Sequence, residues 1–357
     1  MRHLFVVVAV LALLAALLLP LPAMAGRNIW TQTSQGLGGD VDVNAIACSP
    51  NYAADHTGFA GAYTGAFKST DGGLTWVAKA NGLGNANVAA VAISPGYATD
   101  HTVFAGTSNG VRKSTNGGDV WVEVDTGITE KAIRSLAVSP SFVSDHTAYA
   151  GTWSSGVFKT TNGGSSWGRA STGLGDVRVT ALAFSPTYAT DHTIFAGTYG
   201  EGVYRSTNSG GSWSPVNNGL GYLSVLAVVV SPAYASDHTV FAGTYSGGIF
   251  KSTNGGSLWN DANNGLEDAY VQSLAMSPDY ASDQTLFAGS DGGGVSKSTD
   301  GGSTWREMNE GLAKTSILAL VVSPAAPHVL MAGAFGGGVW QFTMITYRVW
   351  APLILKQ

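Results

Sequence analysis

The sequence is poor in charge and nearly free of cysteine. Charged residues make up 11% of the chain, whereas a typical domain has about 25%, and glycine alone accounts for 48 of the 357 residues. The surface must therefore be built mainly from serine, threonine, asparagine and glycine. The formal net charge of -5 supplies no basic field, which argues against nucleic acid as a partner. A single cysteine, Cys48, excludes an internal disulfide.

Long apolar runs are also missing after the first 25 residues. Those residues have the pattern of a secretory signal: the basic start Arg2-His3, an apolar run at 5–19, and a small-x-small cleavage site at 23–25. The apolar run of 15 residues is shorter than the roughly 20 that a membrane-spanning helix needs. We predict that the signal 1–25 is cleaved, that the mature chain is secreted or held in the cell envelope, and that it has no transmembrane span.

What the sequence does have is one unit repeated seven times. The dipeptide Ser-Pro recurs at intervals of 45 or 46 residues, with its serine at positions 49, 94, 139, 185, 231, 277 and 323. Each unit has four short runs rich in Val, Ile, Phe and Tyr, separated by Gly, Asn, Asp and Pro, which is typical of strands. A propeller blade has about 40 to 50 residues. The sequence therefore predicts an all-β fold without helices, a single seven-bladed β-propeller of four-stranded blades over residues 26–343.

The seventh unit ends before its fourth strand, and the missing strand is at the other end of the chain. Trp30 is followed six residues later by Gly-Leu, as Trp76 is in the first unit. We expect this N-terminal strand to complete the last blade and close the ring. The remaining tail, 344–357, either packs on the propeller or serves as a short sorting tag. Cys48 occupies a strand position that is apolar in the other units, which predicts a buried, unreactive thiol.

Six of the units contain an octet that begins with Ser or Thr, has Asp or Asn in third place and ends with Trp. The Asp or Asn side chain suits a turn in which it accepts backbone N–H groups, and the glycine two positions later permits positive φ. The octets resemble the Asp box, or BNR repeat, of sialidases, sortilin-type receptors, xyloglucan-cleaving glycosidases and photosystem II assembly factors. The resemblance implies a propeller in which these turns support the fold away from the ligand site. The residues concerned are Asp71, Trp76, Asn116, Trp121, Asn162, Trp167, Asn208, Trp213, Asn254, Trp259, Asp300 and Trp305.

A second recurring element, Asp-His-Thr, follows the first run of five units, and the sixth has Asp283-Gln284 instead. Five His-Asp pairs suggest a metal site, but adjacent blades keep them in separate sectors where they cannot share one ion. We therefore expect a turn held by the Asp side chain, with the His packed on the Tyr of Ser-Pro-x-Tyr, and we predict no metal and no cofactor.

The candidate ligand site lies on the face opposite the octets, where the loops between second and third strands meet the connections between blades. Aromatic rings at this mouth of a central channel suit the stacking of sugars or the grip of a peptide, although ordinary packing explains them equally well. The candidate ligand-binding residues are Tyr63, Trp153, Tyr199, Glu201, Tyr245, Asp291 and Phe335.

Catalysis is the main alternative to simple binding. A glycosidase needs two carboxyl groups at about 5–5.5 Å or about 6.5–9.5 Å from each other. The acids of this face are scattered over most units and no pair stands out. The sialidase pattern also asks for three arginines, and only Arg134 and Arg178 stand at the start of inner strands on this face.

The sequence therefore favours a monomeric, non-catalytic binding or scaffold propeller outside the cytoplasm. Its expected partner is a polysaccharide or an envelope or extracellular protein. Two alternatives remain open: a glycoside hydrolase of sialidase-like or xyloglucanase-like type, and an assembly factor for a membrane protein complex.

Overall fold

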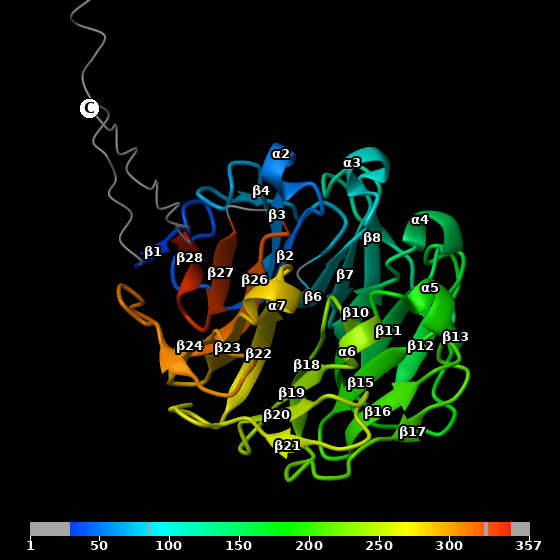
Figure 1. Cartoon of the computed structure of the whole chain (residues 1–357). Coiled ribbons are helices and arrows are strands. Elements are labelled where there is room, and N and C mark those ends of the chain that lie inside the picture. The colour runs from blue at the N-terminus through cyan, green and yellow to red at the C-terminus, as the bar shows by residue number, and fades with distance from the viewer. Residues whose placement is uncertain (1–28, 85, 325–327, 344–357) are drawn as a thin grey trace, which may run out of the picture.

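Seven four-stranded antiparallel sheets stand around one axis in the computed structural model (Figure 1), which describes residues 29–84, 86–324 and 328–343. This confirms the predicted seven-bladed β-propeller. We number the blades in chain order, so that blade 1 is formed by β2 to β5 and blade 7 by β26 to β28 together with β1. The predicted signal 1–25 and the tail 344–357 lie outside the described residues.

The strands keep the same order in every blade. The innermost strands are β2 (Val43–Cys48), β6 (Val88–Ile93), β10 (Ile133–Val138), β14 (Val179–Phe184), β18 (Val225–Val230), β22 (Val271–Met276) and β26 (Ile317–Val322). The second strands are β3 (Gly58–Ala62), β7 (Val103–Thr107), β11 (Ala148–Thr152), β15 (Ile194–Thr198), β19 (Val240–Thr244), β23 (Leu286–Ser290) and β27 (Val329–Ala334).

The outer half of each blade is shorter. The third strands are β4 (Gly65–Ser69), β8 (Gly110–Ser114), β12 (Val157–Thr160), β16 (Gly202–Ser206), β20 (Ile249–Ser252), β24 (Gly294–Ser298) and β28 (Gly338–Thr343). The outermost strands are β5 (Val77–Ala78), β9 (Val122–Glu123), β13 (Gly168–Arg169), β17 (Ser214–Pro215), β21 (Asn260–Asp261), β25 (Arg306–Glu307) and, in blade 7, β1 (Trp30–Gln32).

The expectation of a fold without helices is wrong in detail. Six single-turn helices join first to second strands in the described residues: α2 (Tyr52–Asp55), α3 (Tyr97–Asp100), α4 (Phe142–Asp145), α5 (Tyr188–Asp191), α6 (Tyr234–Asp237) and α7 (Tyr280–Asp283). They are the Asp-His elements. In the first, the Asp55 carboxylate accepts bonds from the Ser49 hydroxyl at 2.6 Å and from the Thr57 N–H at 2.8 Å. Four residues are too few to give a helical period, so the sequence pattern does not reveal them.

The histidine of this element packs as expected. His56 adopts a left-handed conformation, with φ 49°, and its ring meets that of Tyr52 edge-on at 6.1 Å between centroids. The same contact recurs in the next four units. No group of three His, Cys, Asp or Glu side chains suited to a metal ion occurs among the described residues. Burial and the nearby Asp55 carboxylate raise the pKa of the Cys48 thiol to about 12, so the thiol stays protonated and unreactive at neutral pH.

Each octet forms a turn whose polar side chains bind the backbone. The Asp71 carboxylate accepts hydrogen bonds from the Thr75 N–H at 2.9 Å and from the Ser69 hydroxyl at 2.8 Å. The Ser69 hydroxyl oxygen in turn accepts the N–H of Gly73, which has φ 90°. These bonds fix the direction in which the following tryptophan enters the protein.

That tryptophan links neighbouring blades. The backbone and indole N–H groups of Trp213 in blade 4 donate to the carbonyls of Thr172 and Ala170 in blade 3, both at 2.8 Å. Gly173, with φ 81°, lies so close to Trp213 that an added Cβ would be 2.2 Å from its carbonyl oxygen. The same pair recurs at all seven blade junctions, so each blade is held to the previous one by a Trp and a Gly.

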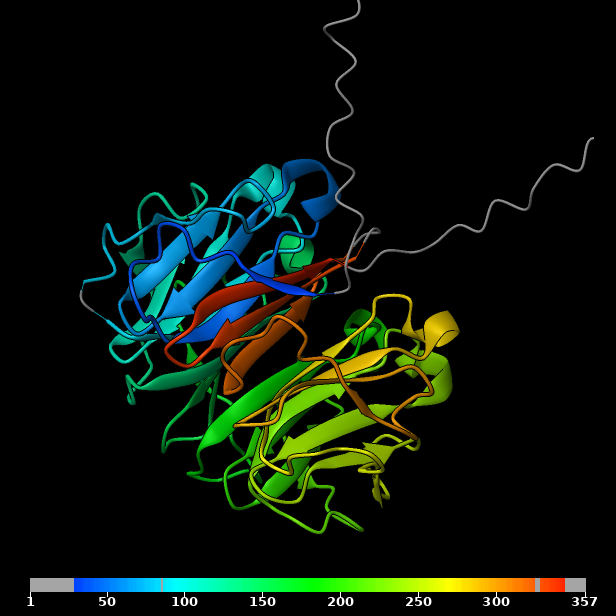
Figure 2. The ribbon, with the colours of Figure 1, turned by 90° about the vertical axis from the view of Figure 1, so that its left-hand side faces the viewer.

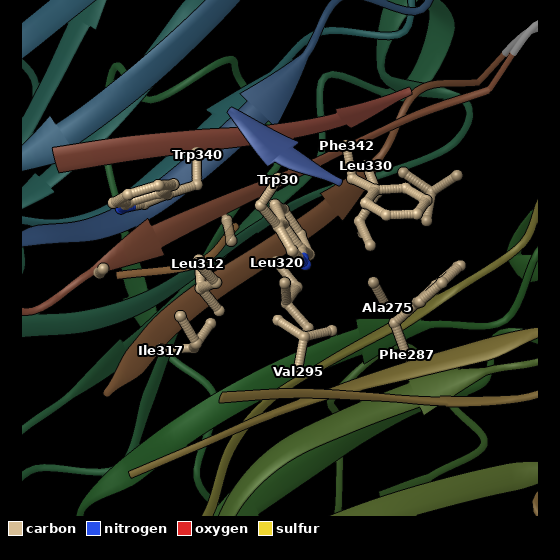
Figure 3. Packing of buried hydrophobic residues seen from close by; sticks show 13 residues of the cluster. Trp30, Ala275, Phe287, Val295, Leu312, Ile317, Leu320, Leu330, Trp340 and Phe342 are labelled. Carbon is tan, nitrogen blue, oxygen red and sulfur yellow. The ribbon is translucent and has the colours of Figure 1, made fainter. Parts of the chain in front are cut away.

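The N-terminal strand closes the ring, as expected. β1 pairs antiparallel with β28, and Trp30 occupies in blade 7 the place of the octet tryptophans, with its backbone N–H on the carbonyl of Glu310 at 2.8 Å. Figure 3 shows the Trp30 side chain directed toward Val295 of blade 6, Leu312 of the connection that follows, and Leu320 of blade 7. In Figure 2 the dark blue β1 lies against the red strands of blade 7. Among the described residues no helix is long and apolar enough to cross a membrane.

Candidate functional site

The backbone builds a regular rim on the face opposite the octet turns. The residue that follows each second strand donates its N–H to the carbonyl of the residue that precedes the inner strand of the same blade, as Tyr245 does to Ser224 at 2.9 Å. The seven rim residues are Tyr63, Ser108, Trp153, Tyr199, Tyr245, Asp291 and Phe335. Because this bond fixes the backbone identically in each blade, the character of the rim depends only on the side chains.

Only some of the predicted aromatic residues come together. Trp153, Tyr199 and Tyr245, which are 39%, 40% and 42% exposed, stand on three consecutive blades. Tyr63 and Phe335, at 67% and 59% exposure, make no ring contact within the described part of the chain. The aromatic candidates therefore divide into one connected group and two isolated side chains.

The connected group is a continuous line of rings and guanidinium groups. The rings of Tyr199 and Tyr245 meet nearly edge-on, 6.0 Å apart between centroids, and those of Tyr245 and Tyr270 lie 4.4 Å apart. The guanidinium carbon of Arg178 lies 4.5 Å from the centroid of Tyr199 and 3.4 Å from that of Trp153. We call Trp153, Tyr199, Tyr245 and Tyr270, with Arg134 and Arg178, the aromatic arc. It crosses blades 3 to 6.

Tyr270 is a member that the sequence pattern misses. It precedes the inner strand of blade 6, where the other units have Asp, Asn, Ala, Arg or Ser. A rim residue meets the residue 25 positions later on the next blade, as Trp153 meets Arg178 and Tyr245 meets Tyr270. Tyr270 could therefore be predicted from the sequence by searching for aromatic or basic residues 25 positions after an aromatic rim residue. Burial, and then the neighbouring Tyr245, raise the pKa of Tyr270, so its hydroxyl stays protonated.

Arg134 completes the arc from inside the channel. It is the second residue of β10 and lies at a break in the β10–β11 register, a bulge that leaves it without a strand partner. Its guanidinium carbon is 4.1 Å from the centroid of Trp153. Arg134 and Arg178 therefore share the ring of Trp153, with their guanidinium carbons 4.1 and 3.4 Å from its centroid. Burial and the charge of Arg178 lower the pKa of Arg134.

The arc borders a central cavity. A space of about 240 Å³ is lined by inner-strand residues of all seven blades, including Arg134, Thr180 and Gln272. Most of the other lining residues are Ala, Val, Leu and Ile, because seven strands converge here and leave little room. Arg134 therefore joins the channel to the exposed rings.

The acids of this face are mostly engaged in holding loops. Asp42 accepts the N–H of Gly336 at 2.7 Å, and Asp268 accepts the N–H groups of Tyr270 and Gly293. Asp291, a predicted ligand residue, accepts the hydroxyl of Ser316 and lies next to Tyr270 at the end of the arc.

Two further acids, Glu201 and Glu130, differ in their surroundings. Glu201, also a predicted ligand residue, is exposed in the loop after Tyr199, and no ion pair joins it to the described arginines. The Ser154 hydroxyl and the Ala132 N–H lower the pKa of Glu130, which is the opposite of what a proton donor needs.

No family model and no curated protein matches the chain. Solved structures do match over most of its length, at low identity. YCF48 bound to D1 peptide is 15% identical with a TM-score of 0.68, over 91% of this chain and 98% of that one. A GH74 xyloglucanase from Xanthomonas campestris is 19% identical with a TM-score of 0.65, over 87% of this chain and 53% of the enzyme.

An extracellular domain from B. thetaiotaomicron is 16% identical with a TM-score of 0.66, over 89% of this chain and 40% of that one. This chain therefore spans about half or less of the enzyme and of the extracellular protein, and nearly all of YCF48. These similarities show a shared seven-bladed fold.

Proposed function

We propose that this chain is an exported, non-catalytic Asp-box propeller that binds a protein or carbohydrate ligand through the aromatic arc. The observation that carries the proposal is the arc itself: side chains from four consecutive blades form one exposed line at the mouth of the channel. Export rests on the signal-like pattern of the first 25 residues.

The arc has the composition of a binding surface. Tyrosine, tryptophan and arginine are the residues that most often dominate the energy of protein interfaces. Tyr63 and Phe335, the other aromatic residues of the rim, make no ring contact among the described residues, so the connected line is a feature of one side of the rim. Among the structural neighbours, YCF48 carries a peptide and the xyloglucanase acts on a polysaccharide, which supports either class of ligand for this fold.

A non-catalytic role is supported by the state of the acids. Glycoside hydrolysis needs a protonated carboxyl group and a second, ionised one across the scissile bond. Here Asp42, Asp268 and Asp291 accept structural hydrogen bonds. Scaffolding in the assembly of a membrane complex would be one use of a protein-binding arc.

The test compares variants of the arc with matched variants of the same rim. The purified mature chain is screened against a glycan array and against the envelope proteins of the producing cell. Tyr199→Ala and Tyr245→Ala should each weaken retention of the ligand about tenfold or more, because hot-spot residues typically contribute about 2 kcal/mol or more. Tyr63→Ala and Phe335→Ala are the controls, being aromatic, exposed and outside the arc.

Equal losses in the control and arc variants would count against this face as a localised site. Release of reducing sugar from a retained glycan would show that the chain is a glycoside hydrolase and would refute the non-catalytic role. Retention unaffected by all four substitutions would place the ligand elsewhere on the propeller.

A further inference from the structure

Two positive charges of the arc stand out because the described residues provide no acid that pairs with them. Neither Arg134 nor Arg178 forms an ion pair with any acid in the ranges that the structure describes, although four other Lys or Arg side chains do so there. Both guanidinium groups lie over the ring of Trp153, and this contact restrains the two side chains and lowers the entropy lost when they bind. Stacking occupies the flat faces of a guanidinium and leaves its N–H edges free to bind oxygen.

The same stacking removes ring faces from the surface. The ring of Trp153 is covered by two guanidinium groups, those of Arg178 and Arg134. Tyr199 has Arg178 over one face, and Tyr245 is covered in part by Tyr270. Since a sugar binds an aromatic residue by stacking on its free face, the arc offers less to a carbohydrate than its count of rings suggests.

The surroundings of the arc suit a polypeptide. Leu223 is 41% exposed, and its carbonyl accepts the N–H groups of Gly200 and Gly202 in the loop that follows Tyr199. Tyr222 is 49% exposed and lies on Gly247, two residues after Tyr245, where an added Cβ would be 2.1 Å from the ring. These exposed aliphatic and aromatic residues beside the arc suit the apolar side chains of a protein segment.

We propose that the ligand of the aromatic arc is a protein segment whose carboxylate is held by the free N–H edges of Arg134 and Arg178. This inference rests on the proposed function and names its ligand class. The carboxylate belongs either to an acidic side chain or to a chain end, since both present the same two oxygens to a guanidinium. The chain as a whole carries a net charge of -5, so attraction of an anion must come from this local pair.

The test uses three immobilised probes and the full mature chain. Poly-L-glutamate presents side-chain carboxylates, and a pool of neutral decapeptides with free C-termini presents chain ends, with the amidated pool as its blank. Polygalacturonate presents carboxylates on sugar rings. We expect binding to one of the two polypeptide probes, weakened by added salt, since exposed charges are screened.

Variants locate the binding on the arc. Arg134→Gln and Arg178→Gln should each raise Kd about 10- to 100-fold, the loss expected for a hydrogen bond to a charged group. Arg178→Lys should fall between wild type and Arg178→Gln, because lysine keeps the charge but not the planar fork. Arg306→Gln, on the exposed outermost strand of blade 6, is the control and should leave Kd unchanged. Thermal midpoints check that each variant is folded.

Each other result overturns the inference. Binding to polygalacturonate alone would assign the carboxylate to a carbohydrate. If the wild-type chain binds none of the probes, or if Arg178→Gln does not change the binding, the arc does not recognise a carboxylate. If the tyrosine variants lose the natural ligand while the arginine variants keep it, the proposed function stands and only this inference fails.

Discussion

The side-chain amide of Gln341 donates a hydrogen bond of 2.9 Å to the carbonyl of Gly72, and this bond joins the last blade to the first. Four other blades make the same contact with a basic residue of the third strand, whose side chain reaches the octet turn 50 residues ahead. The donors there are Lys113, Lys159, Arg205 and Lys251. A neutral amide therefore closes the ring where other junctions use a charge.

The first prediction follows from this comparison. Lys251 donates to the Gly301 carbonyl at 2.7 Å, and burial lowers its pKa. Lys251→Ala leaves that carbonyl without its donor and should reduce the free energy of unfolding by about 1–3 kcal/mol. Lys251→Gln should lose less, because Gln341 makes the equivalent bond. Urea denaturation compares the two, and equal losses would mean that the hydrogen bond contributes nothing beyond side-chain packing.

A second prediction concerns the ring closure. Trp30 is 2% exposed, so Trp30→Ala removes a large side chain from the junction of blades 6 and 7. The expected loss is about 3–5 kcal/mol, a large part of the stability of a typical domain. Thr31→Ala, exposed on the same strand, is the control and should be nearly neutral. Thermal melts followed by circular dichroism measure both, and indistinguishable midpoints would refute β1 as part of blade 7.

A third prediction separates steric contact from backbone strain. Gly219 and Gly175 have nearly the same φ, 80° and 81°, but a Cβ on Gly219 would lie 2.2 Å from the Trp259 carbonyl, whereas Gly175 has nothing within 4 Å. Gly175→Ala should cost about 1 kcal/mol, from the left-handed conformation alone. Gly219→Ala must also push blade 5 away. Its loss in the free energy of unfolding, measured by denaturant titration, should be at least twice that of Gly175→Ala. Equal losses of stability in the two variants would show that the blade junction can rearrange to admit the methyl group without a further energy cost.

The sequence predicts the blades, and it misses features that are too short to show a period or that interrupt the repeat. Seven Ser-Pro units and the match of Trp30 to the octet tryptophans are enough for the blade number and the ring closure, because each blade obeys the same packing constraints. The single-turn helices escape because four residues give no period. Tyr270 was not predicted because it interrupts the repeat. The contact of Arg178 with Trp153 was not predicted because it joins two blades.

The final prediction concerns acid stability. The Thr304 hydroxyl and N–H, together with the Ser298 hydroxyl, lower the pKa of Asp300 to about 2. An unfolded aspartate has a pKa of about 3.9, so the stability that these bonds contribute is present above pH ~4 and is lost as the pH falls toward ~2. Asparagine fills this place in four other octets, and Asn116 accepts the equivalent N–H at 3.0 Å.

Asp300→Asn should therefore fold normally and be somewhat less stable than wild type at pH 7. The difference should shrink as the pH falls from about 4 to about 2, because protonation of the wild-type carboxyl removes its advantage. Urea midpoints at pH 7, 4, 3 and 2 measure this difference, and the matched control is Asn254→Ala, whose effect contains no titrating group and should stay constant. A gap between Asp300→Asn and wild type that is constant or widens on acidification would show that the folded carboxyl does not have the lowered pKa.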